Sequence, residues 1–140
     1  ADEAAEVEAK LAAPPKAKLL AAIPLLHVSH AAAAEAFYCG RLGFTRLFAY
    51  QPDPAQPDPC YLGLARDGVR LDLSSFSGDG VAGGVVGLHV DDVDALYAAF
   101  QARGVTVVLP PTDQSWGSRE LYVKDADGNS LRFIYTPPAP

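Results

Sequence analysis

The chain has 140 residues, 49% of them hydrophobic, and a formal net charge of −6 at pH 7. This length suits one domain with a sizeable core, and the acidic balance argues against nucleic acid and favours neutral or cationic partners. No stretch approaches the roughly 18 apolar residues of a membrane span.

Residues 1–20 differ in composition from the rest of the chain. Their first half is rich in Ala and Glu and favours a helix, which Pro14-Pro15 would end. Because the apolar positions are mostly Ala, we expect a partly disordered or helical N-terminal arm that packs weakly. The simplest interpretation of this arm is a dispensable tail.

Residues 21–76 predict one strand, one helix and three more strands. The helix is rich in Ala, buries Phe37 and ends in the stretch from Gly40 to Gly43. Asp67-Gly68 is a hairpin signal before the last strand, whereas a loop with four prolines separates the two strands before it. In chain order, the five elements are expected at residues 23–28, 31–41, 44–50, 61–65 and 69–76.

Residues 77–84 contain four glycines and are predicted to be a flexible linker. After the linker the same order of elements begins again, with a helix whose first turn is rich in Asp, as the helix dipole favours. In chain order, these elements are expected at residues 85–90, 91–103, 105–109, 121–124 and 130–135.

The two halves also match in residues. His27-Val28 recurs as His89-Val90 at an offset of 62 residues, and Gly43 corresponds to Gly104 at an offset of 61. A repeat of this length is too long for a solenoid unit, so it indicates a domain of two paired modules.

The last two strands predict one apolar and one polar face. Their apolar residues alternate with polar ones at period two, and an Asp-Gly turn joins the strands. Val69, Leu71 and Leu73 are likewise expected to pack on the helices. Counting by two, the polar face gathers Arg70, Asp72, Ser74, Glu120, Tyr122, Arg132, His27 and His89. Such a face suits a hydrogen-bonding, partly charged ligand, and the alternative is a wet surface whose ion pairs contribute little to stability.

Trp116 is the only tryptophan and lies in a predicted loop after Pro110-Pro111, beside Gly117. A loop tryptophan without a surrounding apolar pattern offers a flat π face to aromatic or cationic ligands. The alternative is an anchor that packs the loop.

Cys39 and Cys60 are too few for a disulfide framework and lack metal-ligand spacing. Neither has a His neighbour that would lower the pKa of its thiol, so both are predicted to be structural and reduced. Reduced thiols indicate a cytoplasmic protein, unless a leader has been removed before Ala1.

Taken in order, several motifs resemble the vicinal oxygen chelate superfamily, which includes glyoxalase I, extradiol dioxygenases and bleomycin resistance proteins. The resemblance covers roughly residues 21–136. Its motifs are Ile23-Pro24-Leu25-Leu26, Glu35-Ala36-Phe37-Tyr38, Arg41-Leu42-Gly43-Phe44, the run from Val90 to Tyr97, and Trp116-Gly117 leading to Asp125-Ala126-Asp127-Gly128-Asn129.

The resemblance implies an α+β fold of two βαβββ modules, residues 21–76 and 85–136, joined by the linker. Their curved mixed sheets would enclose a cleft, with the helices on the outer face. Bleomycin resistance proteins are typically homodimers that exchange an N-terminal strand through a Pro hinge, and Pro24 stands at the matching position. A Trp in their corresponding Trp-Gly stretch lines the drug cleft, which implies the same role for Trp116.

The superfamily's four metal-ligand positions fall on Ile23, Asp72, Val85 and Arg132. Only Asp72 can ligate a divalent metal, which needs three or four donors. Arg132 carries a fixed positive charge that would repel a cation and is expected to pair with Asp72. We therefore predict no metal, no other cofactor and no catalytic residue.

His27 and His89 leave an enzymatic alternative open. Both lie on the strand face of the lost ligand positions, so with Asp72 they could form a displaced metal site for a glyoxalase- or dioxygenase-like enzyme. The simpler interpretation is that they line the cleft without a metal, because each lies roughly 13 Å along its strand from the usual position. His30 is expected to be a surface or capping residue.

The sequence thus favours binding over catalysis, although it leaves the question of enzymatic activity open. We expect a small-molecule binding protein, with no nucleic-acid or membrane partner, that sequesters a cationic or aromatic compound in the clefts of a homodimer. A dimeric partner module without any ligand is a third possibility. The expected ligand-binding residues are Trp116, Asp72, Glu120, Tyr122, Arg132, His27 and His89.

Overall fold

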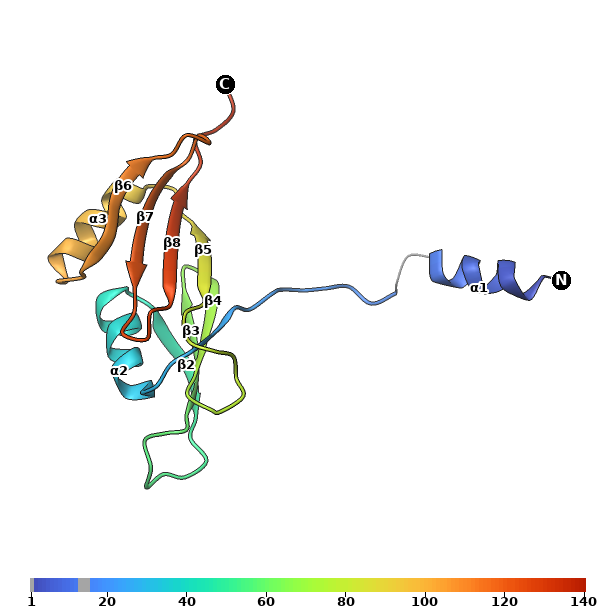
Figure 1. The fold of residues 1–140 in the computed structure, drawn as a ribbon, viewed down its shortest axis with the longest axis horizontal. Coiled ribbons are helices and arrows are strands. Elements are labelled where there is room, and N and C mark those ends of the chain that lie inside the picture. The colour runs from blue at the N-terminus through green and yellow to red at the C-terminus, as the bar shows by residue number, and fades with distance from the viewer. Residues whose placement is uncertain (1, 13–15) are drawn as a thin grey trace.

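The structure, a computed structural model, describes residues 2–12 and 16–140. After α1 (Glu3–Ala12), the first module contains β1 (Leu25–His27), α2 (Ala31–Glu35), η1 (Ala36–Arg41), β2 (Thr45–Tyr50), β3 (Tyr61–Arg66) and β4 (Val69–Ser74). The second module contains β5 (Val85–His89), α3 (Val93–Ala102), β6 (Val107–Asp113), β7 (Arg119–Lys124) and β8 (Ser130–Tyr135). The predicted α+β order of two βαβββ modules is confirmed (Figure 1).

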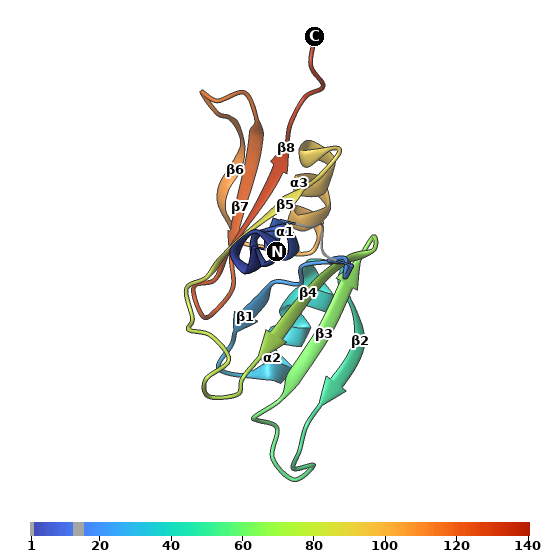
Figure 2. The same ribbon diagram turned by 90° about the vertical axis from the view of Figure 1, so that its right-hand side faces the viewer.

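Each module forms one four-stranded mixed sheet. The strand orders are β1-β4-β3-β2 and β5-β8-β7-β6, so the first strand of each module pairs with its last strand. This pairing is parallel and the others are antiparallel. Figures 1 and 2 show the helices α2 and α3 on one side of the two sheets, which leaves the opposite face of each sheet uncovered.

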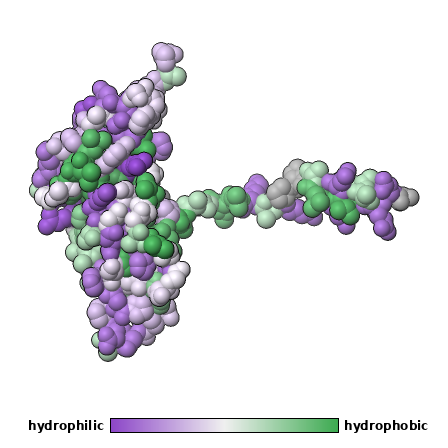
Figure 3. Space-filling model, in the orientation of Figure 1, coloured by the Kyte–Doolittle hydropathy of each residue, from purple (hydrophilic) through white to green (hydrophobic). Residues whose placement is uncertain are grey.

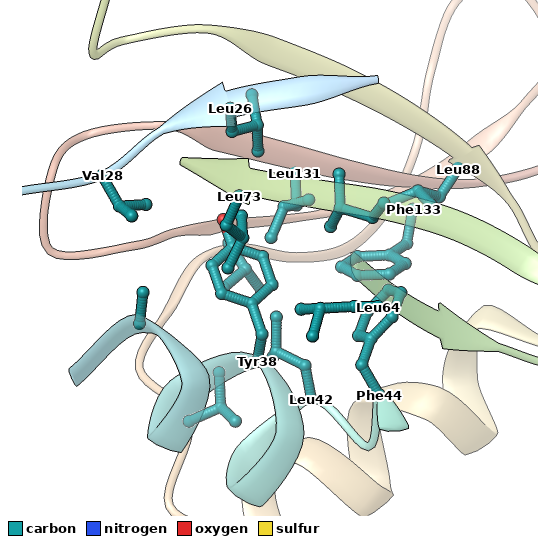
Figure 4. Close-up of a cluster of buried hydrophobic side chains, with 14 of the residues drawn as sticks. Leu26, Val28, Tyr38, Leu42, Phe44, Leu64, Leu73, Leu88, Leu131 and Phe133 are labelled. Atoms are coloured by element: carbon teal, nitrogen blue, oxygen red, sulfur yellow. The ribbon is translucent and has the colours of Figure 1, made fainter. Parts of the chain in front are cut away.

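The helix-facing sides of both sheets contribute to one apolar core. Leu121, Val123 and Leu131 are fully buried, as their alternation predicts. Figure 4 shows Phe44 of the first module beside Leu88 and Phe133 of the second. Removing this apolar surface from water is the main force that holds the modules together.

The helix after β1 buries a different aromatic residue from the one predicted. Phe37 is only partly buried, whereas Tyr38 is inaccessible to solvent. The difference arises in η1, whose π-helical hydrogen bonding changes the direction in which successive side chains point. The Tyr38 hydroxyl donates to Asp125 Oδ2 at 2.8 Å, and burial together with this carboxylate raises the pKa of Tyr38 far above its usual range.

A buried amide in the β7–β8 turn also joins the modules. The Asn129 side chain donates to the His27 carbonyl at 2.8 Å and to Asp125 Oδ2 at 2.8 Å. Its carbonyl oxygen accepts the backbone N–H groups of Gly83 and Gly84. The turn therefore fixes the end of β1 and the end of the linker at one point.

Two strand predictions need correction. The predicted strand 105–109 is instead β6, which continues through Pro110 and Pro111 to Asp113. Proline is tolerated there because β6 is an edge strand with irregular pairing around the prolines. Val69 was expected to pack on the helices, yet it is 47% exposed at the first position of β4, where it lines a cavity.

The N-terminal arm extends away from the two modules (Figure 1). Its predicted helix is present as α1, which has no buried residue, whereas the predicted helix end at Pro14-Pro15 lies outside the described residues. Leu19 and Leu20 are fully exposed in an extended segment before β1, which is apolar in Figure 3. Within residues 2–12 and 16–140, no helix has both the length and the apolar character that a bilayer crossing requires.

Replacing Tyr38 by Phe should lower the free energy of unfolding by about 2 kcal/mol, because the carboxylate of Asp125 then loses a hydrogen-bond donor in the interior. Urea denaturation measures this change. Tyr97→Phe is the matched control, since the Tyr97 hydroxyl bonds the Gln101 side chain at the surface, and its expected effect is within about 0.5 kcal/mol. Equal effects of the two substitutions would contradict a structural role for the Tyr38–Asp125 hydrogen bond.

Candidate functional site

The strand registers place the predicted polar residues on the uncovered face of each sheet, called here the open face. In the first sheet Asp72 lies opposite Leu25 and Gly63, and Ser74 lies opposite His27 and Tyr61. Leu71 and Leu73 between them are fully buried. The predicted alternation along β4 is therefore correct from Arg70 onward.

The second sheet follows the same pattern. Arg132 of β8 lies between Gly87 and Tyr122 in register, and the next open-face row contains His89 and Glu120. Each sheet therefore brings a carboxylate, an arginine and a histidine to its open face.

Glu120 is the centre of what we call the Trp116 cluster, made of Trp116, Ser118, Glu120 and Tyr122. Glu120 is only 5% exposed. Its carboxylate accepts hydrogen bonds from Trp116 Nε1 at 2.9 Å, from the Ser118 hydroxyl and from the Tyr122 hydroxyl at 2.6 Å. Hydrogen bonds from Ser118 and Tyr122 hold the pKa of the Glu120 carboxyl below its usual range, although burial opposes them. A buried carboxylate with three donors is a fixed acceptor inside the protein.

The indole ring of Trp116 remains accessible although its N–H is bonded. The residue is 69% exposed and lies in a turn closed by the Gln114 N–H donating to the Ser118 carbonyl at 2.7 Å. Gly117 has a φ of 100° in this turn, a conformation that favours glycine. The faces of the indole ring are therefore accessible to solvent while its N–H is held inside the protein.

The arginines of the open faces also have internal partners. Arg132 lies over the Tyr122 ring, with its Cζ 5.0 Å from the ring centroid. Asp72 accepts from Arg70 Nη2 at 2.7 Å and from the Tyr61 hydroxyl at 2.6 Å. The predicted pairing of Asp72 with Arg132 is therefore wrong within this chain, because each side chain is bound inside its own sheet.

Sequence reasoning missed an aromatic row on the open face of the first sheet, formed by Phe48, Tyr50, Tyr61 and Phe76. Phe48 stacks on Tyr61 with centroids 6.1 Å apart, and Tyr50 stacks on Phe76 at 5.9 Å. Gly63 makes room for Phe48, since a Cβ at this position would lie 2.2 Å from the ring. The sequence did contain a signal for this row. Gly63 lies within one predicted strand, and Phe48 and Tyr50 lie two residues apart in the preceding one, a pattern that indicates a ring packed over the glycine.

The structure does not bring the two predicted histidines together. His27 Nδ1 lies 3.2 Å from the Asp79 carbonyl oxygen, whereas His89 lines a cavity between the modules. In the described part of the chain, no three His, Cys, Asp or Glu side chains lie close enough together to hold a metal ion. A displaced site made of His27, His89 and Asp72 is therefore not assembled in this chain.

The remaining polar candidates have surface or structural positions. His30 lies at the N-cap of α2 with an exposed side chain and makes no capping hydrogen bond. Asp58 instead accepts the Ala31 N–H at 3.0 Å. Cys39 is partly buried, Cys60 is buried, and both are free thiols.

Comparison with known proteins identifies relatives with this fold. The family model described as the Glyoxalase/Bleomycin resistance protein/Dioxygenase superfamily matches residues 21–133, whereas no curated protein matches. A superfamily member from Sphaerobacter thermophilus DSM 20745 is 26% identical, with a TM-score of 0.67 over 84% of this chain and 98% of that one.

Two further solved structures share the fold at lower identity. A bleomycin resistance determinant encoded on the transposon Tn5 is 23% identical, with a TM-score of 0.69 over 86% of this chain and 100% of that one. A bleomycin-binding protein complexed with bleomycin is 24% identical, with a TM-score of 0.67 over 85% of this chain and 100% of that one.

The acid response of Trp116 fluorescence tests the Trp116 cluster. Because the pKa of Glu120 lies below its ordinary value of 4.5, the hydrogen bonds it accepts are complete above pH 4.5 and are lost only as the pH falls through the lower, folded value. We expect constant emission down to pH 4.5 and a change below it.

Glu120→Gln should abolish this transition, since its side chain does not titrate. Circular dichroism at each pH separates the local change from global unfolding. A transition above pH 4.5, or the same transition in Glu120→Gln, would show that another group controls the indole.

Proposed function

Because the chain belongs to the Glyoxalase/Bleomycin resistance protein/Dioxygenase superfamily, we propose that it binds and sequesters a small cationic or aromatic compound. The observation that carries this proposal is the exposed indole of Trp116, held in place by the buried carboxylate of Glu120. One structural relative is a bleomycin-binding protein, and sequestration requires no reaction. The free thiols of Cys39 and Cys60 suit a cytoplasmic location.

In this proposal Trp116 stacks on the ligand and Glu120 acts through Trp116. A ring held in one orientation before binding loses little conformational entropy when the ligand arrives. The Glu120 carboxylate already accepts three hydrogen bonds from within the protein, so in this proposal it does not bind the ligand directly. Glu120 is therefore a positioning residue, whereas Tyr122 and Arg132 form the polar floor beside the indole.

The first sheet supplies a second aromatic surface. Phe48 is 44% exposed and Tyr50 is 59% exposed, and both rings are already stacked on neighbours. A planar ligand placed between these rings and an indole gains stacking on both of its faces. Asp72 and His27 line the same open face, and the net charge of −6 attracts cations to it.

We propose that two copies of the chain form the binding unit. Leu19 and Leu20 are fully exposed in an extended segment, and burying two such side chains gives a gain of about 3–6 kcal/mol. The Pro24 carbonyl accepts the Asp72 N–H of the same chain at 2.9 Å, so we propose that the segment before Pro24 is the part that contacts a second copy. A symmetric pair would then have two equivalent clefts.

A metal-dependent enzyme is the less favoured candidate. Of the four ligand positions implied by the superfamily, Ile23 and Val85 have no donor atom and Arg132 is a cation. Both Asp72 oxygens already accept hydrogen bonds from Arg70 and Tyr61. These residues do not fit a divalent metal, so the proposal includes no metal-dependent step.

Isothermal titration with a panel of cationic glycopeptide drugs of the bleomycin type should give about one ligand per chain, the stoichiometry of two equivalent clefts per dimer. Trp116→Ala should weaken binding by at least about tenfold, because central aromatic contacts dominate interface energies. Val81→Ala, an exposed apolar residue in the linker, is the control and should leave the affinity unchanged. Absence of heat for the whole panel would reject drug binding.

A double-mutant cycle then tests the role of Glu120. If it acts through the indole, Glu120→Gln weakens binding in the wild-type background and has no further effect in Trp116→Ala. Equal losses in both backgrounds would show that the carboxylate contacts the ligand directly.

The oligomeric state has its own test. Light scattering after size exclusion should give the mass of two chains for the wild type and of one chain for the Leu19→Asp, Leu20→Asp double variant, because a buried charge opposes association. Leu11→Asp in α1, a similarly exposed leucine, is the matched control and should remain dimeric. A dimeric double variant would show that the arm is dispensable for association.

A further inference from the structure

A cavity of about 590 Å³ opens between the two modules. On one side it is bounded by the β3–β4 hairpin and Val69, and on the other by residues 87–92, with Ala95 and Ala99 of α3. No residue of the Trp116 cluster or of the aromatic row lines it. Its volume lies within the range of small-molecule sites.

The floor of the cavity is apolar and belongs to both modules. Phe44 comes from the first module, and Leu88, Leu96 and Phe133 come from the second. All four are less than 10% exposed, so the cavity reaches the side chains of the core. Figure 4 shows Phe44, Leu88 and Phe133 together at this junction. An apolar body placed there removes hydrophobic surface from water on both sides.

The rim of the cavity is acidic. Asp67, Asp91 and Asp92 line it, with Arg66 as the one basic side chain among its lining besides His89. Arg66 donates to the Leu42 carbonyl at 2.6 Å and lies 3.5 Å from Asp67, so its charge already has acceptors. Asp67 is paired with Arg66, and Arg103 Nη1 lies close to Arg66 beside Gly43. Asp92 accepts the Ala95 N–H as the N-cap of α3, and no ion pair involves Asp91 in the described part of the chain. The remaining negative charge of Asp91 and Asp92 favours a cationic group.

We propose that this cavity is a second binding site, for an organic ammonium compound with a small ring system. The ring would rest on the Phe44–Phe133 floor, and the ammonium group would lie at the rim beside Asp91 and Asp92. This site does not depend on the sequestration proposed for the open faces.

The probe is 2-naphthylmethylammonium, compared with the neutral 2-naphthylmethanol. Titration into the ¹⁵N-labelled full chain should shift the backbone amides of residues 87–92 and of Ala95. The ammonium compound should bind at least about fivefold more tightly than the alcohol, because only the cation is attracted to the rim, and salt should reduce the difference. Equal affinity for both probes would overturn the assignment of a cation site.

Ala95→Phe should fill the cavity and weaken probe binding by at least about tenfold. Ala98→Phe is the matched control, since Ala98 is exposed on the same helix but does not line the cavity. Asp91→Asn should weaken the ammonium probe by about threefold and leave the alcohol unchanged. Circular dichroism confirms that each variant is folded.

Trp116→Ala separates the two sites. It should leave probe binding unchanged, so that failure of drug binding at the open face would not affect this result. The proposal is overturned if Ala95→Phe binds the probe like the wild type, or if the shifted amides lie around Trp116. It is also overturned if Ala95→Phe changes the mass of the assembly, which would show that a second copy covers the cavity.

Discussion

The polar turn between β7 and β8 determines how the two modules are placed relative to each other. Asp125 accepts the hydroxyl of Tyr38 from the first module, and Asn129 bonds the end of β1 and the end of the linker. Asn129 is inaccessible to solvent, so these hydrogen bonds form where water does not compete. Apolar burial alone would tolerate sliding of one module over the other, whereas these directional contacts require one arrangement. The open faces and the cavity between the modules both follow from that arrangement.

The two open faces use the same chemistry with different residues. In the first sheet a tyrosine hydroxyl and an arginine satisfy Asp72, and in the second a tyrosine, a serine and an indole satisfy Glu120. Asp72 and Glu120 are each 5% exposed as residues, so neither carboxylate is a free surface charge. Aromatic rings are among the side chains that remain exposed, with Phe48 and Tyr50 on the first face and Trp116 on the second, where Arg132 is exposed as well. The faces therefore offer aromatic surfaces next to carboxylates that already have hydrogen-bond partners.

Local sequence patterns correctly predicted the features that depend only on residues close together in the chain. The alternation of polar and apolar residues along β4, β7 and β8 correctly predicted which side chains lie on the open faces, because the strand register preserves this alternation. The choice of Phe37 over Tyr38 failed because a π-helical turn has no clear sequence signal. The hydrogen-bond partners of Asp72 could not be predicted from the sequence, because the distances between side chains on a sheet depend on its twist and on the side-chain rotamers. The sequence could not predict the cavity either, because its floor forms only when residues 44 and 133, from different modules, come into contact.

The environment of Asp72 shows how this chain satisfies a buried carboxylate. A buried carboxylate is costly unless a cation or several donors satisfy it. In this chain the Arg70 guanidinium and the Tyr61 hydroxyl satisfy it. In the same sheet Arg70 also lies 5.6 Å from the centroid of Phe48, so the residue that neutralises Asp72 supports the aromatic row. One arginine thus serves both the buried carboxylate and the exposed aromatic surface of the first sheet.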